Sequence, residues 1–247
     1  MTRSAAPPLR AMVLAAGYGK RMLPLTATVP KPLLTVGGRT MLDQVLDKLR
    51  VGGVDRIVVN AGYLGAQIIA HCAARRDLPG LKISVEPEPL ETGGGVKQAL
   101  PLLGNDPFFV INADLPWTDG ARPALQRLRA AWNPAAMDML LLTMPLALAN
   151  GFSKGDFALQ PDGQLRRHGV ETKPDVFIGA MIAKPELFAA IPAEKFSSNQ
   201  LFDAAEAVGR LYGLTHDGTC YHVGTPADLT RANQLLADKR GWQVATV

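Results

Sequence analysis

The stretch LAAGYGKRMLPLTATVPKPL, residues 14–33, joins a short apolar segment to a loop rich in glycine, proline and basic side chains. The apolar residues that lead into it predict a buried strand. Gly17 and Gly19 lack a Cβ atom, so the backbone there can approach a ligand closely, and successive N–H groups in such a turn bind anions. Arg21 and Lys31 add positive charge. The stretch therefore predicts a site for an anionic ligand, with a tight turn carrying surface charges as the plain alternative.

The composition is that of a globular protein. The chain has 247 residues, 47% hydrophobic and 19% charged, which is enough for one large α/β domain. The net charge of +4 is not gathered into a basic tail, and the three tryptophans are scattered, so we expect no nucleic-acid partner. Cys72 and Cys220 form no CxxC motif. Without a signal-peptide core or a long apolar run, we expect a cytoplasmic protein and no membrane partner.

Strand and helix patterns alternate in the first half of the chain. Strands are expected at residues 11–14, 56–60, 82–86 and 107–112, and helices at 41–49, 64–74 and from Gly93, interrupted at Pro101. This alternation predicts a parallel sheet covered by helices on both faces.

The second half is less regular. The patterns there predict strands at 139–144 and 176–182, a hairpin of 157–160 with 164–168, helices at 185–190, 199–208 and 226–236, and a closing pair of strands at 211–215 and 219–223. No repeat or linker divides the chain, so we expect one domain over residues 1–247.

The opening loop fits neither of two common phosphate-binding motifs. A dinucleotide fingerprint needs GxGxxG leading into a helix, but Met22 stands at the third glycine and Pro24 follows. A Walker loop is absent too. Residues 14–33 instead resemble the signature of the sugar-1-phosphate nucleotidyltransferases, whose pattern is close to LAAGxGxRMxPLTxxxPKPL.

The resemblance implies both a fold and a reaction. The family fold is a single Rossmann-like α/β domain with a mixed, mostly parallel central sheet, and a small β-rich part that binds sugar. Residues 10–115 would form the nucleotide-binding half, and 116–240 the sugar-phosphate-binding half. Such enzymes join a nucleoside triphosphate (NTP) to a sugar 1-phosphate and release pyrophosphate, and their catalysis depends on cationic positioning of the phosphates.

The same resemblance assigns roles to residues of the chain. Arg21 would hold the triphosphate and stabilise the leaving pyrophosphate, Lys31 would neutralise the reacting phosphate, and Asp114 would complete the catalytic set. The residues implied in nucleotide binding are Ala15, Ala16, Gly17, Gly19, Arg21, Glu86, Thr92 and Gly93.

Two positions bear on a metal ion. Asp114 follows the apolar strand PFFVIN, and the segment NAD resembles the family's NGD, whose aspartate binds Mg²⁺; a turn or helix cap is the alternative. In the segment CYHVGTP, His222 stands where relatives carry a second aspartate. A neutral imidazole prefers softer ions than Mg²⁺. Either Asp114 and the phosphates hold Mg²⁺, or His222 joins an ion such as Mn²⁺, or activity is impaired.

Two further segments suggest the substrates. EPEPLETGGGVKQAL, residues 86–100, resembles the family's nucleobase loop, and the LETGGG form is similar to that of N-acetylmuramate-1-phosphate uridylyltransferases of cell-wall recycling. Three glycines at a helix start would offer free N–H donors. By resemblance, the residues that would meet the sugar phosphate are Lys31, Gly155, Asp156, Lys173 and Gly179, although Lys173 is also typical of a surface lysine.

We therefore expect an enzyme that uses UTP and N-acetylmuramate 1-phosphate, as a monomer or small homo-oligomer. The alternatives are a mannose-1-phosphate guanylyltransferase and a glucose-1-phosphate uridylyl- or thymidylyltransferase. A catalytically weak sensor of nucleotide or sugar phosphate is the alternative of another class, suggested by His222.

Overall fold

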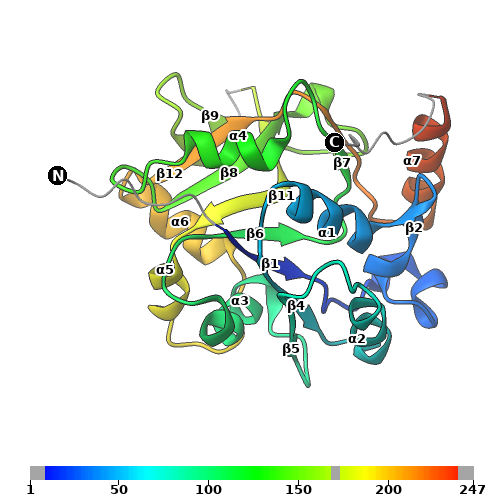
Figure 1. Cartoon of the computed structure of the whole chain (residues 1–247). Helices are drawn as coiled ribbons and strands as arrows, with labels where there is room; N and C mark the ends of the chain where they lie inside the picture. The colour runs from blue at the N-terminus through cyan, green and yellow to red at the C-terminus, as the bar shows by residue number, and fades with distance from the viewer. Residues whose placement is uncertain (1–8, 168–172, 239–247) are drawn as a thin grey trace.

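The computed structural model describes residues 9–167 and 173–238. A nine-stranded sheet crosses the molecule in the order β10-β9-β11-β6-β1-β4-β5, with β8 paired to β11 and β12 paired to β8 (Figure 1). The strands β1 (Arg10–Leu14), β4 (Arg56–Ala61), β5 (Leu81–Val85) and β6 (Phe108–Asn112) are parallel. They are the four strands predicted in the first half.

The second half of the chain adds antiparallel strands beside β6. The long strand β11 (Asp175–Ala183) lies antiparallel to β6, to β8 (Met139–Pro145) and to β9 (Phe157–Leu159). The predicted hairpin joins β9 to β10 (Leu165–Arg167); His168, at its expected end, lies outside the described residues. The expectation of a mixed, mostly parallel sheet with a β-rich second part is confirmed.

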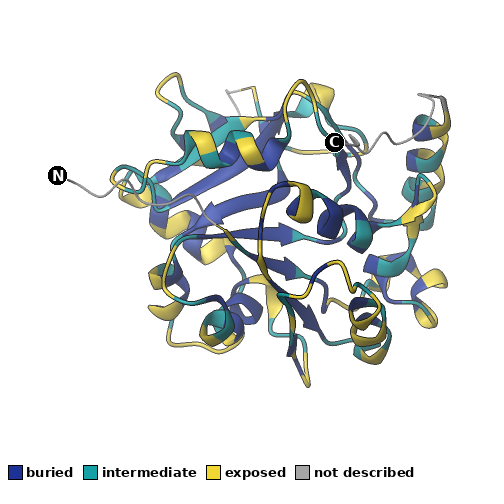
Figure 2. Ribbon diagram, in the orientation of Figure 1, coloured by how far each residue is buried: buried dark blue, intermediate teal, exposed yellow. Residues whose placement is uncertain are grey.

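Helices cover both faces of the sheet because alternate strand residues point to opposite sides. On one face, α1 (Met41–Val51), α2 (Gly65–Ala73) and α4 (Ala124–Ala131) pack on residues such as Val13 and Ile111. On the other face, α3 (Glu91–Leu103), α5 (Pro185–Ala189) and α6 (Asn199–Ala207) pack on Met12 and Val110. The central strands are accordingly buried on both sides (Figure 2).

A third, smaller core holds the end of the chain against its beginning. The C-terminal helix α7 (Pro226–Asp238) packs Ala232 and Leu236 against Met22, which follows β1, and Val36 of the short strand β2 (Thr35–Val36). β2 pairs with β3 (Arg39–Thr40). This packing places the loop after β1 next to the segment that carries His222. No helix in residues 9–167 or 173–238 is both long enough and apolar enough to span a bilayer.

Two expectations about the secondary structure are wrong. Pro101 does not interrupt α3, because it lies in the last turn of a helix that runs on to Leu103. The segments 211–215 and 219–223 do not pair with each other. Instead β12 (Leu211–Thr215) extends the sheet parallel to β8, and β13 (Thr219–Cys220) pairs with β7 (Trp117–Thr118).

Buried His216 lies between β12 and the segment that pairs with β7. Its backbone N–H donates to the Thr143 carbonyl at 2.7 Å, and its Nε2 lies 2.9 Å from the carbonyl of Thr118. The first bond continues the pairing of β12 with β8 and the second joins the same residue to β7, with which β13 pairs.

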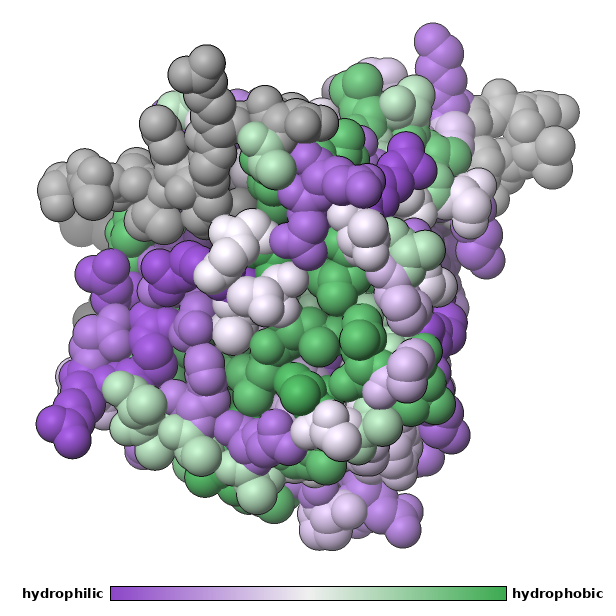
Figure 3. Space-filling model, turned by 90° about the vertical axis from the view of Figure 1, so that its right-hand side faces the viewer, coloured by the Kyte–Doolittle hydropathy of each residue, from purple (hydrophilic) through white to green (hydrophobic). Residues whose placement is uncertain are grey.

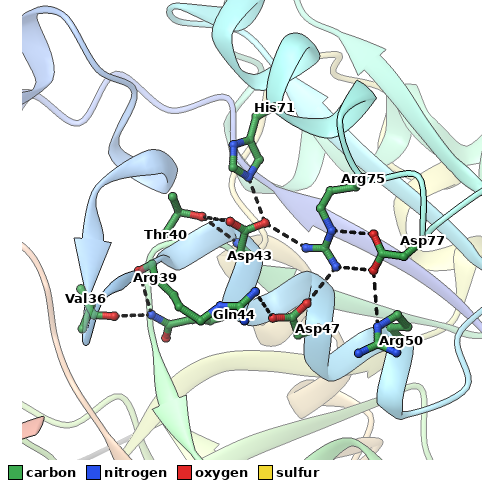
Figure 4. A network of polar contacts seen from close by, with 10 residues as sticks. All are labelled: Val36, Arg39, Thr40, Asp43, Gln44, Asp47, Arg50, His71, Arg75 and Asp77. Atoms are coloured by element: carbon green, nitrogen blue, oxygen red, sulfur yellow. Dashed lines mark hydrogen bonds and ion pairs between the residues drawn. The ribbon is translucent and has the colours of Figure 1, made fainter. Parts of the chain in front are cut away.

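An ion-pair network on one flank ties α1 to α2 (Figure 4). Arg75 donates to Asp43 at 2.9 Å, to Asp47 at 2.8 Å and to Asp77 at 2.9 Å, and His71 contacts Asp43 at 2.9 Å. Burial alone would raise the pKa of Asp43, but hydrogen bonds to His71 and neighbouring donors outweigh it and lower that pKa. The network includes none of the cavity-lining residues described below, so its role is structural.

Candidate active site

A cavity of about 380 Å³ lies where β1 and β6 end. This is the edge at which open α/β sheets bind ligands, because loops diverge there from the carboxyl ends of parallel strands. Figure 3 views the molecule from that side, and hydrophobic residues gather in the middle of the face with hydrophilic ones around them. The cavity is lined by Leu14, Ala15, Ala16, Gly17, Gly19, Lys20, Arg21, Met22, Lys31, Pro32, Asn60, Glu86, Pro89, Glu91, Thr92, Asn112, Asp114 and Gly224.

The cavity brings together nearly all of the residues predicted on the nucleotide side. Ala15, Ala16, Gly17, Gly19, Arg21, Lys31, Glu86, Thr92 and Asp114 all line it. The loop after β1 therefore meets two other segments that follow parallel strands, one after β5 and one after β6.

Gly19 lets the loop fold back over Lys31. Its φ is +61°, and an added Cβ would lie 3.1 Å from both Lys31 Cβ and Thr26 Cγ2. Thr26 also donates from its hydroxyl to the Gly19 carbonyl at 2.9 Å. A side chain at position 19 would be strained by its backbone angle and would push against these neighbours. Gly17 differs, since an added Cβ there would meet nothing within 4 Å.

Lys31 and Asp114 form an ion pair inside the cavity. The Lys31 Nζ lies 2.6 Å from Asp114 Oδ2. The lysine is buried, with 9% of the residue exposed, whereas 39% of the Asp114 side chain is exposed. The pair thus places a cation and a partly accessible carboxylate oxygen at one point. Asp119, not Asp114, caps the next helix, since its Oδ1 accepts from Ala124 N at 3.0 Å.

His222 lies beside the cavity. A Cβ added to Gly224, which lines the cavity, would lie 2.4 Å from His222 Nε2 and 3.4 Å from Arg21 Nη1. The imidazole packs against the Phe152 ring at a centroid distance of 5.0 Å. Burial, and then the positive charge of Lys31, lower the pKa of His222. The side chain is therefore a neutral imidazole near pH 7.

The donors around Asp114 suit a metal ion only if a ligand supplies the rest of the shell. Among the described residues, no group of three or more His, Cys, Asp or Glu side chains is placed to hold a metal. Asp114 offers an oxygen of the type that Mg²⁺ prefers, and His222 offers a neutral nitrogen that suits Mn²⁺ better. Phosphate oxygens of a nucleotide would complete either set.

Asn60 is a cavity residue that the sequence patterns did not single out. Asn60 is the last residue but one of β4 and is 2% exposed. Its Oδ1 accepts from the Ala15 N–H at 2.5 Å. Its Nδ2 donates to Glu86 Oε1 at 2.6 Å. A signal was available, because a polar side chain at the carboxyl end of an apolar strand lies at the ligand-binding edge of a parallel sheet.

The glycines at the start of α3 have a different role from the expected one. The N–H groups of Gly93 and Gly94 both donate to the Phe196 carbonyl, at 2.9 and 3.1 Å, so they are not free donors. A Cβ on Gly93 would lie 2.3 Å from the Phe196 ring. These glycines allow close packing of residues 194–196. Thr92 accepts from Ser198 N at 2.9 Å, which leaves its hydroxyl hydrogen for the cavity.

Apart from Lys31, the residues predicted to meet the sugar phosphate lie outside the cavity lining. A Cβ on Gly155 would lie 2.1 Å from Pro174 Cβ, and Asp156 accepts from the Phe177 N–H at 3.0 Å. Lys173 is exposed. Gly179 comes nearest the site: its φ is +81°, and an added Cβ would lie 3.1 Å from the Cβ of Asn112, which lines the cavity.

Comparisons with known proteins agree with this geometry. Residues 10–152 match the family model described as Nucleotidyl transferase. The chain is 41% identical to an N-acetylmuramate alpha-1-phosphate uridylyltransferase of Caulobacter vibrioides, over 94% of this chain and 98% of the relative. A protein of the same description from Neisseria meningitidis serogroup B is 35% identical, over 92% and 98%.

A solved structure supports the fold. The putative glucose-1-phosphate thymidylyltransferase from Bacillus anthracis, crystallised with a sucrose, superposes with a TM-score of 0.77 at 19% identity, covering 95% of this chain and 97% of that one. The signature loop, the cavity and these relatives lead to one conclusion: the chain belongs to the nucleotidyl transferase family.

Proposed function

We propose that the protein transfers a uridylyl group from UTP to N-acetylmuramate 1-phosphate, with release of pyrophosphate. The observation that carries the proposal is the Lys31–Asp114 ion pair, 2.6 Å between Nζ and Oδ2, in the same cavity as Arg21 and the glycine loop. This cavity presents cations and backbone turns suited to a polyanion. The choice of UTP and of the sugar is supported by the names of the two relatives of 41% and 35% identity.

The reaction forms a bond between a phosphate oxygen of the sugar and the α-phosphorus of the NTP. The bond between the α-phosphorus and the bridging oxygen to the β-phosphorus breaks, and pyrophosphate leaves with the electron pair. In the proposed mechanism Lys31 neutralises the reacting phosphate and Arg21 stabilises the leaving pyrophosphate. Both act by fixed charge, because phosphoryl transfer needs positioning and electrostatic stabilisation more than covalent chemistry.

The proposal includes a divalent cation, Mg²⁺ or Mn²⁺. Asp114 would hold it, and His222 would join as a second ligand for a softer ion such as Mn²⁺. A bound cation would offset negative charge on the phosphates. The neutral state of His222 is compatible with ligation, since an imidazole binds a metal through an unprotonated nitrogen.

We also propose that one half of the chain binds the nucleotide and the other half binds the sugar phosphate. Residues of about 10–115 would bind the nucleotide through Ala15, Ala16, Gly17, Gly19, Arg21, Glu86 and Thr92. Gly93 would shape the loop beside Thr92 rather than donate its N–H, which the Phe196 carbonyl accepts. Residues of about 116–240 would bind the sugar phosphate with Gly155, Asp156, Lys173 and Gly179. A sugar side that begins at Gly179 is supported by the contact of this residue with Asn112, which lines the cavity.

Location and partners complete the proposal. We propose a cytoplasmic enzyme of cell-wall recycling that acts as a monomer or small homo-oligomer and has no nucleic-acid or membrane partner. The two described cysteines are free and buried, which fits a reducing compartment.

A substrate panel tests the proposed function. Pyrophosphate release is measured with UTP, dTTP, GTP, CTP and ATP against N-acetylmuramate, mannose and glucose 1-phosphates, with Mg²⁺ and with Mn²⁺. The highest kcat/KM is expected for UTP with N-acetylmuramate 1-phosphate. A higher kcat/KM for GTP with mannose 1-phosphate would contradict this choice of substrates and favour a mannose-1-phosphate guanylyltransferase. Nucleotide binding without turnover under every condition would favour the sensor.

A further inference from the structure

Asn60 connects the loop after β1 to a buried carboxylate. Asn60 is 2% exposed and Glu86, the first residue after β5, is 3% exposed. The Ala15 N–H donates to Asn60 Oδ1 at 2.5 Å, and Asn60 Nδ2 donates to Glu86 Oε1 at 2.6 Å. The Leu90 N–H donates to Glu86 Oε2 at 2.9 Å. Three segments of the chain therefore meet in one hydrogen-bonded unit.

The direction of these bonds is set by the backbone. A backbone N–H can only donate, so the Ala15 N–H requires the amide oxygen of Asn60 on its side. The Asn60 NH₂ group then has to face Glu86, and Glu86 Oε1 has to accept. Leu90 imposes the same role on Glu86 Oε2. Both oxygens of this carboxylate are thus held as acceptors by neutral N–H groups.

The remaining lone pairs of Glu86 have one open direction. Each carboxylate oxygen has two lone pairs, and the bonds described use one on each. On the α3 side, a Cβ added to Gly95 would lie 2.5 Å from Glu86 Oε1 and 2.8 Å from Asn60 Nδ2, so that side is closed. The cavity is lined by both Asn60 and Glu86. The unused acceptor capacity is therefore available to a ligand.

The burial of Glu86 lowers the stability of the fold. Glu86 makes no ion pair among residues 9–167 and 173–238, although it is almost wholly buried. A buried carboxylate without a cation is unfavourable compared with a neutral or apolar side chain. Buried groups that are unfavourable for stability in this way concentrate at functional sites.

We propose that Asn60 is a positioning residue that holds Glu86 as a fixed hydrogen-bond acceptor for the nucleobase. The site then selects bases with a ring N–H on the pairing edge, which are uracil, thymine and guanine. A ring nitrogen of the base faces Glu86 in this arrangement, so the site disfavours cytosine, because its N3 carries a lone pair there and only its exocyclic amino group could donate. This inference rests on the proposed function for its substrate class, and it adds the residue that sets base selection.

The first test is Asn60→Asp. This change keeps an oxygen for the Ala15 N–H but turns a second carboxylate oxygen toward Glu86 in place of the NH₂ group. We expect KM for UTP to rise at least tenfold, and the ratio of kcat/KM for UTP over CTP to fall at least tenfold. KM for the sugar phosphate should change less than twofold. An unchanged UTP/CTP ratio would show that Asn60 is merely structural.

Asn233→Asp is the matched control. Asn233, on α7, also accepts a backbone N–H, from Gly37 at 2.9 Å, and donates to carbonyls of Thr35 and Leu229. It lies outside the cavity lining. The same chemical change there is expected to lower Tm while the UTP/CTP ratio stays within twofold of the wild type. A tenfold fall in the UTP/CTP ratio for this variant would show that the effect is not specific to Asn60.

The double change Asn60→Asp with Glu86→Gln reverses the polarity of the pair. The new amide NH₂ can donate to the new carboxylate, and its oxygen can still accept from Leu90 N–H. We expect Tm to recover relative to Asn60→Asp alone. The amide now presents an N–H to the cavity, so CTP should gain at least tenfold over UTP. Recovery of Tm with the original preference for UTP would overturn the proposal.

Calorimetric binding of UTP, GTP, CTP and ATP without sugar phosphate separates this inference from the proposed function. If the wild type turns over no substrate pair, the proposed function fails, but the base preference in binding still tests Asn60. Wild-type binding of CTP as tight as that of UTP would overturn the inference even if turnover is found. If Asn60→Asp does not fold, the double variant carries the same test.

Discussion

Replacing Arg21 by alanine separates a catalytic role for this residue from a structural one. Arg21 is exposed, lines the cavity, and makes no ion pair with any residue that the structure describes. Its removal therefore breaks no buried contact, and such surface changes alter the free energy of unfolding by about 0.5 kcal/mol or less. For a chain of this size the melting temperature should shift by about 2 °C at most.

The effect on the reaction should be much larger. A preorganised charge that stabilises a leaving group contributes about 2–4 kcal/mol to the transition state. Since about 1.36 kcal/mol is a factor of ten in rate, Arg21→Ala should lower kcat about 30- to 900-fold. Pyrophosphate release at saturating NTP and sugar phosphate measures kcat, and thermal unfolding measures Tm on the same preparation.

Arg122→Ala is the matched control for this prediction. Arg122 is also exposed, but it lies outside the cavity lining, between β7 and α4. Its replacement should leave kcat within twofold of the wild type. Full kcat in Arg21→Ala would refute the role of Arg21 in stabilising the leaving group. A loss of activity accompanied by a fall of several degrees in Tm would refute it too.

Other predictions follow from the same site and from the network in Figure 4. Asp114→Asn should lower turnover at least about 100-fold, because it removes the negative ligand beside Lys31; thermal melts should show a folded protein, and full activity would contradict the metal assignment. His222→Asp should raise the ratio of Mg²⁺- to Mn²⁺-supported turnover, since it restores an oxygen ligand; a fall in that ratio would show that the imidazole is needed. Arg75→Ala should lower the free energy of unfolding by about 2–3 kcal/mol, because it leaves a cluster of aspartates without their shared partner; urea unfolding measures this, and a loss under 0.5 kcal/mol would contradict it. The hydrogen bond to Arg75 lowers the pKa of Asp77 to about 2. An unfolded aspartate titrates near about 4, so this group stabilises the fold above that pH, and the contribution is lost as pH falls toward 2. Melts from pH 7 to pH 2 should show this loss in the wild type and a smaller one in Arg75→Ala; equal slopes would contradict the linkage.

Much of the fold follows from local patterns in the chain. Apolar runs and helical spacing located the parallel strands β1, β4, β5 and β6 and the helices between them. The helix α1 begins after Thr40, a residue type that commonly caps helices, and the Thr40 Oγ1 accepts from Asp43 N at 3.0 Å. Such features depend on residues within one or two turns of each other, which is why they can be read without a structure.

The signature loop was also recognisable, and its resemblance to the family named Asp114 and Glu86, but the contacts that these residues make could not be predicted. Lys31 and Asp114 are 83 positions apart, and Asn60 and Glu86 are 26 apart. Their contacts exist because β1 lies between β4 and β6 in the sheet, with β5 beside β4, so the carboxyl ends of these strands share one edge. Strand order is decided by packing of the whole chain rather than by any local pattern.

The glycines of α3 also show the difference between what a local pattern predicts and what the fold decides. Their presence at a helix start was visible in the sequence, and free N–H donors were a reasonable expectation. Only the folded chain brings the Phe196 carbonyl to within 2.9 Å of the Gly93 N–H. Local sequence thus determined which segments are strands, helices and loops, and where charge is available. Tertiary packing decided which of those charges and donors meet, because hydrogen bonds and ion pairs form only between groups that the fold brings within about 3 Å.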